Sequence, residues 1–301
     1  MKGISTLLLS LLALFTGASA SAYAGAPMAV IVDTDMALDD VRAIALLSSC
    51  DSIRLLAAVS SDGSCTPAVG AANLRRVLSR LGMADVPVGV GRALGVKAPA
   101  WRPMAESLGG WIAEADSAAS RSPVTITAVE LLRETLERHD GVVYLCLGPL
   151  TNLADLLAQD PSAATKLARV QYWGTHPDSV LASWNTERDP RSAERVFAAG
   201  LPISGVMLPD DRLLTYDRKL AVAVCALGSV QAELLCQIHA SPEARNMVAI
   251  KHFRCWDETA VLDLLFPELF TSSKAARGRG LERSFDLDRG RQRYLDLLAG
   301  D

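Results

Sequence analysis

Four carboxylates stand within eight residues near the start of this chain: Asp33, Asp35, Asp39 and Asp40. The apolar run Val30-Ile-Val precedes them, so a strand is expected to end at Asp33 and a helix to begin near Asp39. Crowding raises carboxylate pKa values through mutual repulsion unless a cation favours the ionised forms. Calcium fits best, because it takes hard oxygen ligands in irregular geometry, whereas the turn has no sulfur or imidazole for zinc. Helix capping is the alternative, but it explains only Asp39 and Asp40.

The elements that would position these carboxylates form an α/β pattern. Short β-branched runs alternate with amphipathic stretches after residue 28, which indicates an open, mainly parallel sheet with helices on both faces. We expect strands at residues 29–33, 53–59, 86–90, 142–147, 170–173 and 203–208. We expect helices at residues 39–49, 67–81, 124–139, 152–159 and 190–199, an irregular stretch at 89–122, and extra helices, chiefly 220–239 and 258–265, in the C-terminal third. Ligands of such sheets bind beyond the carboxyl ends of the strands, where the acidic turn lies.

Four motifs along the chain carry a family resemblance. Asp33-Thr-Asp-Met-Ala-Leu-Asp-Asp40 resembles the DxDxxxDD signature of the inosine-uridine nucleoside hydrolases, and Leu147-Gly-Pro-Leu-Thr-Asn-Leu-Ala154 is similar to their GPLTN motif. Trp184-Asn185 ahead of Asp189-Pro190, and then Trp256-Asp257, follow in the family's order. The resemblance covers most of the chain and implies the family's fold and its activity, the calcium-dependent hydrolysis of ribonucleosides to free base and ribose.

The resemblance also implies roles for individual residues. The calcium ligands would be the carboxylates of Asp35, Asp40 and Asp257 and the backbone carbonyl of Leu147. Asp35 would accept a proton from the metal-bound water as it attacks the anomeric carbon. Asp39 and Asn185 would hydrogen-bond the ribose hydroxyls, and Asp33 would support the turn. Carboxylates near the sugar would stabilise its oxocarbenium-like charge.

The expected base-binding groups are aromatic. Many pyrimidine-accepting members of the family have a His before the last Asp, whereas Trp256 precedes Asp257 here, which implies a purine nucleoside as substrate. Trp101 could complete a stack on the base, although ordinary packing explains Trp256 equally well. His176 follows the end of an expected strand and is a candidate proton source for the leaving base. The other histidines, including His252, are expected at the surface or in packing.

Two serines depart from the family pattern on the ribose side. Ser64 stands where the family usually has Asn, and Ser183 stands where a Glu usually binds the 5′ hydroxyl. These changes favour an alternative function, a non-catalytic exported protein that binds calcium and a nucleoside or other ribose-bearing ligand. A lesser alternative is a haloacid-dehalogenase-like phosphatase, because Asp33-Thr-Asp35 resembles its DxD turn. That signature requires Thr or Val at the position of Ala37.

The N-terminal segment is typical of a secretory signal peptide. Lys2 precedes an apolar run at residues 7–15, and small residues offer cleavage after Ala20 or Ala24. The run is shorter than the ~20 apolar residues of a spanning helix. We therefore expect residues 1–24 to be removed, leaving a secreted or periplasmic protein with no membrane association and a single nucleoside hydrolase-like domain at residues 25–301.

Composition limits the partners. The net charge is −4 and Lys and Arg are scattered, so no basic stripe is available for nucleic acid. A small-molecule nucleoside is the expected partner, and the family resemblance implies a homo-oligomer, a dimer or tetramer. The six cysteines lack zinc-ligand spacing, and an oxidising compartment permits disulfides of unassigned pairing. Cys146 and Cys225 lie in apolar runs and are expected to pack as small hydrophobic thiols.

Overall fold

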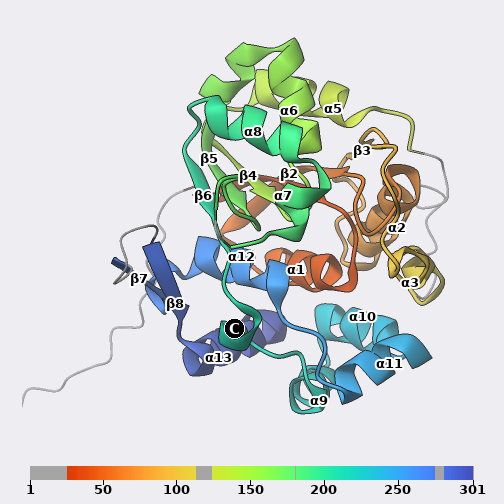
Figure 1. Ribbon diagram of the computed structural model, residues 1–301. Helices are drawn as coiled ribbons and strands as arrows, with labels where there is room; N and C mark the ends of the chain where they lie inside the picture. Colours follow the sequence, from red (N-terminus) through yellow and green to blue (C-terminus); the bar gives the residue numbers. More distant parts are fainter. Residues whose placement is uncertain (1–25, 113–123, 180, 275–280, 301) are drawn as a thin grey trace, which may run out of the picture.

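The computed structural model describes residues 26–112, 124–179, 181–274 and 281–300, and it contains one six-stranded sheet whose strands are all parallel. Its strands are β1 (Met28–Thr34), β2 (Ile53–Ser60), β3 (Val88–Val90), β4 (Val142–Cys146), β5 (Leu167–Tyr172) and β6 (Ile203–Gly205), in the spatial order β3-β2-β1-β4-β5-β6. A separate antiparallel hairpin pairs β7 (Phe270–Lys274) with β8 (Leu281–Phe285). Figure 1 shows the sheet between two layers of helices.

The chain changes direction across the sheet between β1 and β4. Strands β1 to β3 step toward one edge, and β4 to β6 step toward the other. Asp33 near the end of β1 lies in register with Cys146 at the end of β4, so the acidic turn and the segment after Cys146 are neighbours. In open α/β sheets a ligand crevice forms at such a switch point, beyond the carboxyl ends of the strands.

Helices cover both faces of the sheet. They are α1 (Leu38–Ser48), α2 (Pro67–Arg80), α3 (Arg102–Ser107), α5 (Ala128–Arg138), α6 (Thr151–Gln159), α7 (Trp184–Arg188), α8 (Pro190–Ala198), α9 (Arg218–Cys225), α10 (Val230–Ile238), α11 (Pro242–Ala249), α12 (Trp256–Leu265) and α13 (Leu287–Ala299). Val30 and Val32 face a core shared with α1, α2 and α12, whereas Ile31 faces a second core under α5, α6 and α8. The alternation follows from the two-residue period of a strand, and the expected fold class is confirmed.

The structure also departs from the expected elements. The helix expected at residues 220–239 is two helices, α9 and α10, because Gly228 adopts φ of 70° and the Ser229 side chain caps α10. The stretch 89–122, expected to be irregular, contains the short helix α3, and its residues 113–123 lie outside the described residues. Helix α7 and the β7–β8 hairpin were not predicted, whereas α11 and α13 are among the extra helices expected in the C-terminal third.

Two cysteines join α9 to α10. Cys225 and Cys236 form a disulfide, so the interpretation of Cys225 as a packed thiol was wrong. Cys146 is a buried free thiol, as its apolar surroundings predict. Among the described helices, none has both the length and the apolar character needed to cross a membrane. The expected signal peptide, residues 1–24, lies outside the described residues.

Candidate active site

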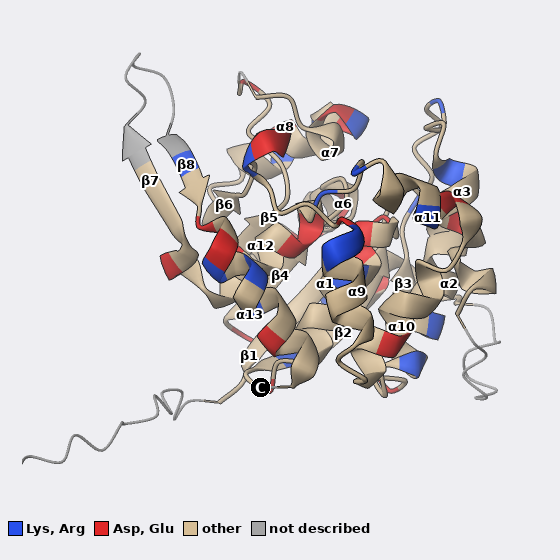
Figure 2. Ribbon diagram, turned by 90° about the horizontal axis from the view of Figure 1, so that it is seen from below, with Lys and Arg blue, Asp and Glu red and all other residues tan. Residues whose placement is uncertain are grey.

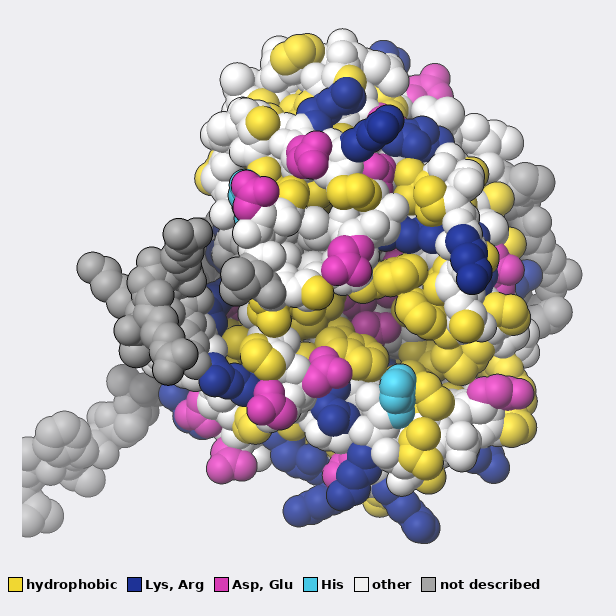
Figure 3. Space-filling view, viewed as in Figure 1, with side chains coloured by type: hydrophobic (Ala, Val, Ile, Leu, Met, Phe, Trp, Pro, Cys, Tyr) yellow, Lys and Arg dark blue, Asp and Glu magenta, His cyan; other side chains and the backbone are white. Residues whose placement is uncertain are grey.

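A cavity of about 420 Å³ lies beyond the carboxyl ends of β1 and β4. Figure 3 shows a hollow lined by hydrophobic side chains, with acidic side chains at its depth. Its lining includes the carboxylates of Asp35, Asp39, Asp40 and Asp257, called the cavity floor below, and the indoles of Trp101, Trp184 and Trp256, called the cavity wall. The acidic turn thus reaches the crevice that the sheet topology predicts.

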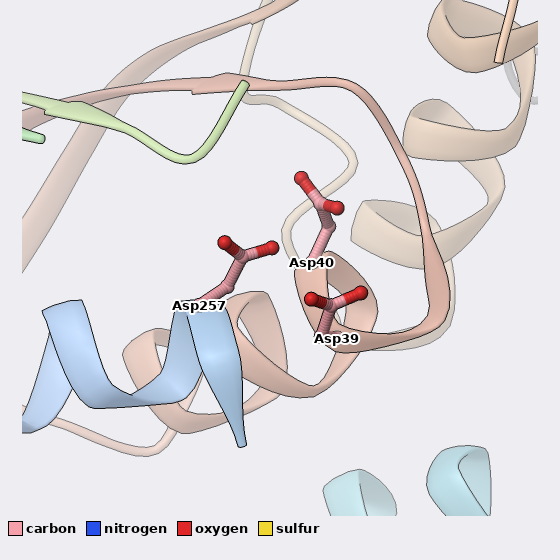
Figure 4. A group of neighbouring side chains, drawn as sticks. All are labelled: Asp39, Asp40 and Asp257. Carbon is pink, nitrogen blue, oxygen red and sulfur yellow. The ribbon is translucent and has the colours of Figure 1, made fainter. Parts of the chain in front are cut away.

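The carboxylates of Asp39, Asp40 and Asp257 converge at the floor. One oxygen of each lies within 4.8 Å of the others. Figure 4 shows the three side chains together, Asp39 and Asp40 from α1 and Asp257 from α12. Asp39 and Asp40 occupy the first turn of α1, and Asp257 occupies the first turn of α12. Helix N-termini stabilise negative charge, so the two helices together favour an anionic group here. Elsewhere the charges are mixed: Figure 2 shows Lys and Arg interspersed with Asp and Glu along the ribbon.

Burial and repulsion make the ionised floor costly without a cation. Burial raises the pKa of Asp40 and of Asp257 well above the usual range, and the neighbouring carboxylates raise it further. Burial also raises the pKa of Asp39 to about 7. Asp257 Oδ1 is buried and, within the described part of the chain, accepts no hydrogen bond. A divalent cation would supply both the missing partner and the missing charge, and a set of carboxylate oxygens suits calcium.

The Asp40 carboxylate also accepts hydrogen bonds within the acidic turn. Its Oδ2 accepts a hydrogen bond from Ala37 N at 2.9 Å, and its Oδ1 accepts from Asp35 N at 3.2 Å and from the Thr34 hydroxyl. The capping interpretation is therefore correct for the contacts of Asp40. A carboxylate has about four lone-pair directions, so these bonds leave room for a cation.

Asp35 lies at the floor beside a glycine that leaves space for it. Its Oδ2 accepts a hydrogen bond from Ser64 N at 2.9 Å, and a Cβ at Gly63 would stand 1.9 Å from the same oxygen. The adjacent Met36 is fully buried and adopts φ of 60°, which is uncommon for a residue other than glycine. Burial raises the pKa of Asp35. The turn is thus shaped to hold a buried carboxylate against the cavity.

Asp33 lies behind the floor rather than in the cavity lining. Its Oδ2 accepts a hydrogen bond from the Tyr144 hydroxyl at 2.7 Å, and its Oδ1 accepts from Asn152 Nδ2 at 3.0 Å. Burial raises its pKa to about 7, although these donors oppose the rise. The contacts join the ends of β1 and β4 to α6, which is a supporting arrangement of the kind the sequence predicts.

Asn185 and Leu147 meet at one side of the floor. Asn185 Nδ2 donates to Leu147 O at 2.6 Å and to Trp173 O at 3.0 Å. Its Oδ1 is buried and has no hydrogen-bond partner among the described residues. The amide nitrogen is therefore committed to the protein, and the oxygen is the atom left to accept a hydrogen bond from a ligand.

Two indoles of the cavity wall, those of Trp101 and Trp184, come from different segments of the chain and contact each other. Trp101 Nε1 donates to Ser64 Oγ at 3.0 Å, and the Trp101 ring meets the Trp184 ring edge-on at 4.8 Å between centroids. Ser64 therefore holds the wall through its hydroxyl while its backbone amide holds Asp35. Trp184 was quoted in a motif but given no role in the sequence interpretation, and it lines the cavity.

Ser183 and Trp256 lie at the cavity but also make structural contacts. The Ser183 hydroxyl caps α7 by accepting a hydrogen bond from Thr186 N. Trp256 Nε1 donates to Asp210 Oδ1 at 2.9 Å, which fixes the plane of the indole. Both sequence-predicted residues reach the site, and their polar atoms are engaged within the protein.

Two histidines lie differently toward the cavity. His176 does not line the cavity; its Nδ1 accepts a hydrogen bond from Asp178 N at 3.0 Å, and its ring packs against Phe197. His176 thus lies outside the cavity lining, and its role as a proton source stays a prediction. His252 is exposed and packs against Phe253 and Trp256, as surface or packing predicts, and it also lines the cavity.

Three charged residues support the cavity wall, and the sequence interpretation gave them no role. Asp62 Oδ1 pairs with Arg102 at 2.6 Å and with Arg188 at 2.7 Å. Burial opposes ionisation of Asp62, but its hydrogen bonds with Leu94 N and the two arginines hold its pKa below the usual value. The pairs tie α3 to α7, the helices beside Trp101 and Trp184. No sequence spacing relates these three residues, so only the fold reveals them.

Comparison with known proteins identifies the family. Residues 30–292 match the inosine-uridine preferring nucleoside hydrolase family. The chain belongs to this family, whose members are metal-dependent enzymes that act on N-glycosyl bonds. The resemblance stated from the four motifs is thereby confirmed.

Individual relatives resemble the chain over different lengths. The pyrimidine-specific ribonucleoside hydrolase RihA of Shewanella woodyi is 29% identical over 271 residues, 82% of each protein. The protein of the same name from Klebsiella pneumoniae subsp. pneumoniae is 30% identical over 188 residues, so the match spans 58% of that relative's length and 58% of this chain. A solved plant nucleoside hydrolase shares the fold, with a TM-score of 0.74 and 20% identity over 91% of this chain and 99% of that one.

Proposed function

We propose that this protein hydrolyses the N-glycosidic bond of ribonucleosides in a calcium-dependent reaction, with purine nucleosides preferred. The observation that carries the proposal is the floor: carboxylates from the N-termini of α1 and α12 lie within 4.8 Å of one another at the switch point of the sheet. Family membership supports the reaction class. The ion and the base preference are the parts that experiment must decide.

The residues at the cavity floor have two proposed roles, cation binding and ribose binding. Asp35, Asp40, Asp257 and the carbonyl of Leu147 would hold the ion, and Asp39 and the free Oδ1 of Asn185 would accept hydrogen bonds from the ribose hydroxyls. When bound, calcium would lower the pKa of a water ligand. Asp35 would accept a proton from the water that attacks the anomeric carbon. The clustered carboxylates stabilise the positive charge that develops on the sugar as the base leaves.

The wall supports a large aromatic base. Trp101, Trp184 and Trp256 line the cavity beside the floor, and Trp256 occupies the position before Asp257. Indole faces stack on nucleobases, and a purine offers them the larger surface. The RihA relatives are pyrimidine-specific by name, so purine and pyrimidine substrates need direct comparison.

The test is the release of free ribose from a panel of nucleosides. We expect release from inosine, adenosine or guanosine to exceed release from uridine, and to stop on addition of a chelator and resume with calcium. Faster uridine cleavage would overturn the purine preference alone. If no nucleoside in the panel releases ribose, the proposal that the protein is a nucleoside hydrolase is overturned.

A second candidate function rests on the two engaged serines. Ser64 and Ser183 use their hydroxyls within the protein, so the ribose side offers few free polar groups. A non-catalytic protein that binds calcium and a nucleoside would fit such a pocket. Nucleoside binding by calorimetry without ribose release would favour this candidate.

Two further expectations concern the export of the protein and its oligomeric state. We propose that the protein is exported, after removal of residues 1–24, and that it forms a homo-oligomer. Mass determination of the secreted product and light scattering of the purified protein test these two points.

A further inference from the structure

A fully buried ion pair lies directly beneath the cavity floor. Arg42 Nε donates to Glu258 Oε1, and neither side chain has any solvent exposure. Arg42 stands two residues after Asp40 in α1, and Glu258 follows Asp257 in α12. The pair therefore joins the two helices at the places where each contributes its carboxylates.

We propose that Arg42 and Glu258 are positioning residues that set the separation between the carboxylates of α1 and α12, and hence the affinity of the floor for its cation. The inference rests on the proposed calcium site and adds to it a device that this chain uses to shape the site. Neither residue lines the cavity, so they act through Asp40 and Asp257 rather than on the ligand.

The surroundings of Arg42 restrict its guanidinium to one place. One terminal nitrogen lies 3.3 Å from His239 Nε2, and the other donates to Arg254 O at 2.9 Å. The guanidinium also lies over the Tyr216 ring, 4.6 Å from its centroid. Since Arg254 lies just ahead of α12, Arg42 fixes both the approach to that helix and, through Glu258, its first turn.

The separation of α1 and α12 matters because a cation needs its ligand oxygens at closely defined distances. Calcium binds carboxylate oxygens at ~2.3–2.6 Å, so a shift of about 1 Å between α1 and α12 removes one helix's ligand from its place. A buried ion pair, by contrast, adds little net stability relative to apolar residues of similar volume. The pair is therefore better explained by the position it enforces than by the stability it adds.

The double variant R42M/E258L separates these two roles. Its apolar side chains refill the space without leaving a lone buried charge, so we expect the variant to fold, with a urea midpoint lowered only by the loss of the Arg42 contacts to Arg254 O and His239. Calcium affinity, measured by calorimetry on the full mature protein, is expected to fall about tenfold or more. A folded double variant with wild-type calcium affinity would overturn the inference.

A matched control lies on the same helix, away from the cavity. Asp263 is buried in α12, accepts a hydrogen bond from Gln171 Nε2 at 2.7 Å and pairs with Arg283. D263N is expected to lower the urea midpoint while calcium affinity stays within about twofold of wild type, because this contact lies beyond the helix turn that holds the floor. A loss of affinity in D263N equal to that in R42M/E258L would mean that general destabilisation, and not positioning, is responsible.

A milder variant keeps the test decisive if the double variant fails to fold. R42K keeps the positive charge beside Glu258, but an ammonium cannot reproduce the fork that reaches Glu258 and Arg254 O together, and we expect about threefold to tenfold weaker calcium binding. Unchanged calcium affinity in R42K would then overturn the inference. If the wild-type protein binds no calcium, the proposed metal site fails together with this inference, whereas failure of the variants alone leaves the proposed function standing.

Discussion

The floor and the wall of the cavity are held in different ways. The floor carboxylates come from a strand end and from the first turns of α1 and α12, which pack on each other in the core. The wall indoles of Trp101 and Trp184 are partly exposed, at 43% and 37%, and depend on side-chain contacts such as the pairs of Asp62. The floor is therefore fixed by packed helices, whereas the wall depends on side-chain contacts. Two of these contacts reach the floor, because Ser64 bonds both Trp101 and Asp35 and the Trp184 side chain hydrogen-bonds Asp35.

The largest effect is expected at the floor. Asp35→Asn keeps the size of the side chain but cannot accept a proton, so ribose release at saturating nucleoside should fall by about 10²- to 10⁴-fold. The control is Asp178→Asn, a change to an exposed carboxylate outside the cavity lining. Activity of Asp35→Asn comparable with the control would show that Asp35 is not the proton acceptor.

The next prediction concerns the close contact between Gly63 and the Asp35 carboxylate. In Gly63→Ala the new methyl group would stand 1.9 Å from Asp35 Oδ2, so the carboxylate must move and both activity and thermal stability should drop. Overpacking of this kind costs about 1–3 kcal/mol. Gly110→Ala, where a Cβ meets nothing within 4 Å, serves as the control. Equal melting temperatures and rates in the two variants would contradict the close contact.

A smaller and different effect is expected at the wall. Trp101→Ala removes a surface on which a base can stack and touches no floor carboxylate directly, so the loss of about 1–3 kcal/mol should raise KM while kcat changes little. Trp111→Ala, which removes an exposed indole outside the cavity lining, should leave both constants unchanged. A fall in kcat with unchanged KM would mean that the wall takes part in the chemistry and that the division from the floor is wrong.

The smallest effect concerns the histidine that the structure places outside the cavity. His176→Ala should change ribose release by less than about twofold, since substitutions distant from a site are close to neutral. His252→Ala, a change at the cavity lining, is the informative comparison. A loss of activity only in the His176 variant would support the sequence-based hypothesis for that residue.

The floor was largely predictable because its residues obey local rules. Asp33 and Asp40 flank a strand-to-helix turn in one short segment, and Asp257 lies at the start of an expected helix. Parallel topology places the first turn at the carboxyl edge of the sheet, whereas α12 follows another helix, so only the family resemblance indicated that Asp257 joins the turn. The split at Gly228, in contrast, shows how a single glycine and a following serine cap end an apolar run that reads as one helix.

The wall was poorly predictable because long-range contacts determine it. Asp62, Arg102 and Arg188 are far apart in sequence and carry no shared pattern, yet one carboxylate oxygen joins them. The position of His176 outside the cavity lining was missed for the same reason, since a strand end does not reveal where the following loop turns. Local pattern therefore predicts the reactive groups of this site better than the groups that surround its ligand.

Calcium titration by calorimetry of three proteins tests the central claim most directly. The wild-type protein and Trp101→Ala are expected to bind about one ion per chain with similar affinity. Asp257→Asn is expected to lose that binding, because it removes the charge of a floor carboxylate whose Oδ1 has no hydrogen-bond partner among the described residues. Wild-type affinity in Asp257→Asn, or no binding by the wild-type protein, would contradict the account of the floor as a calcium site.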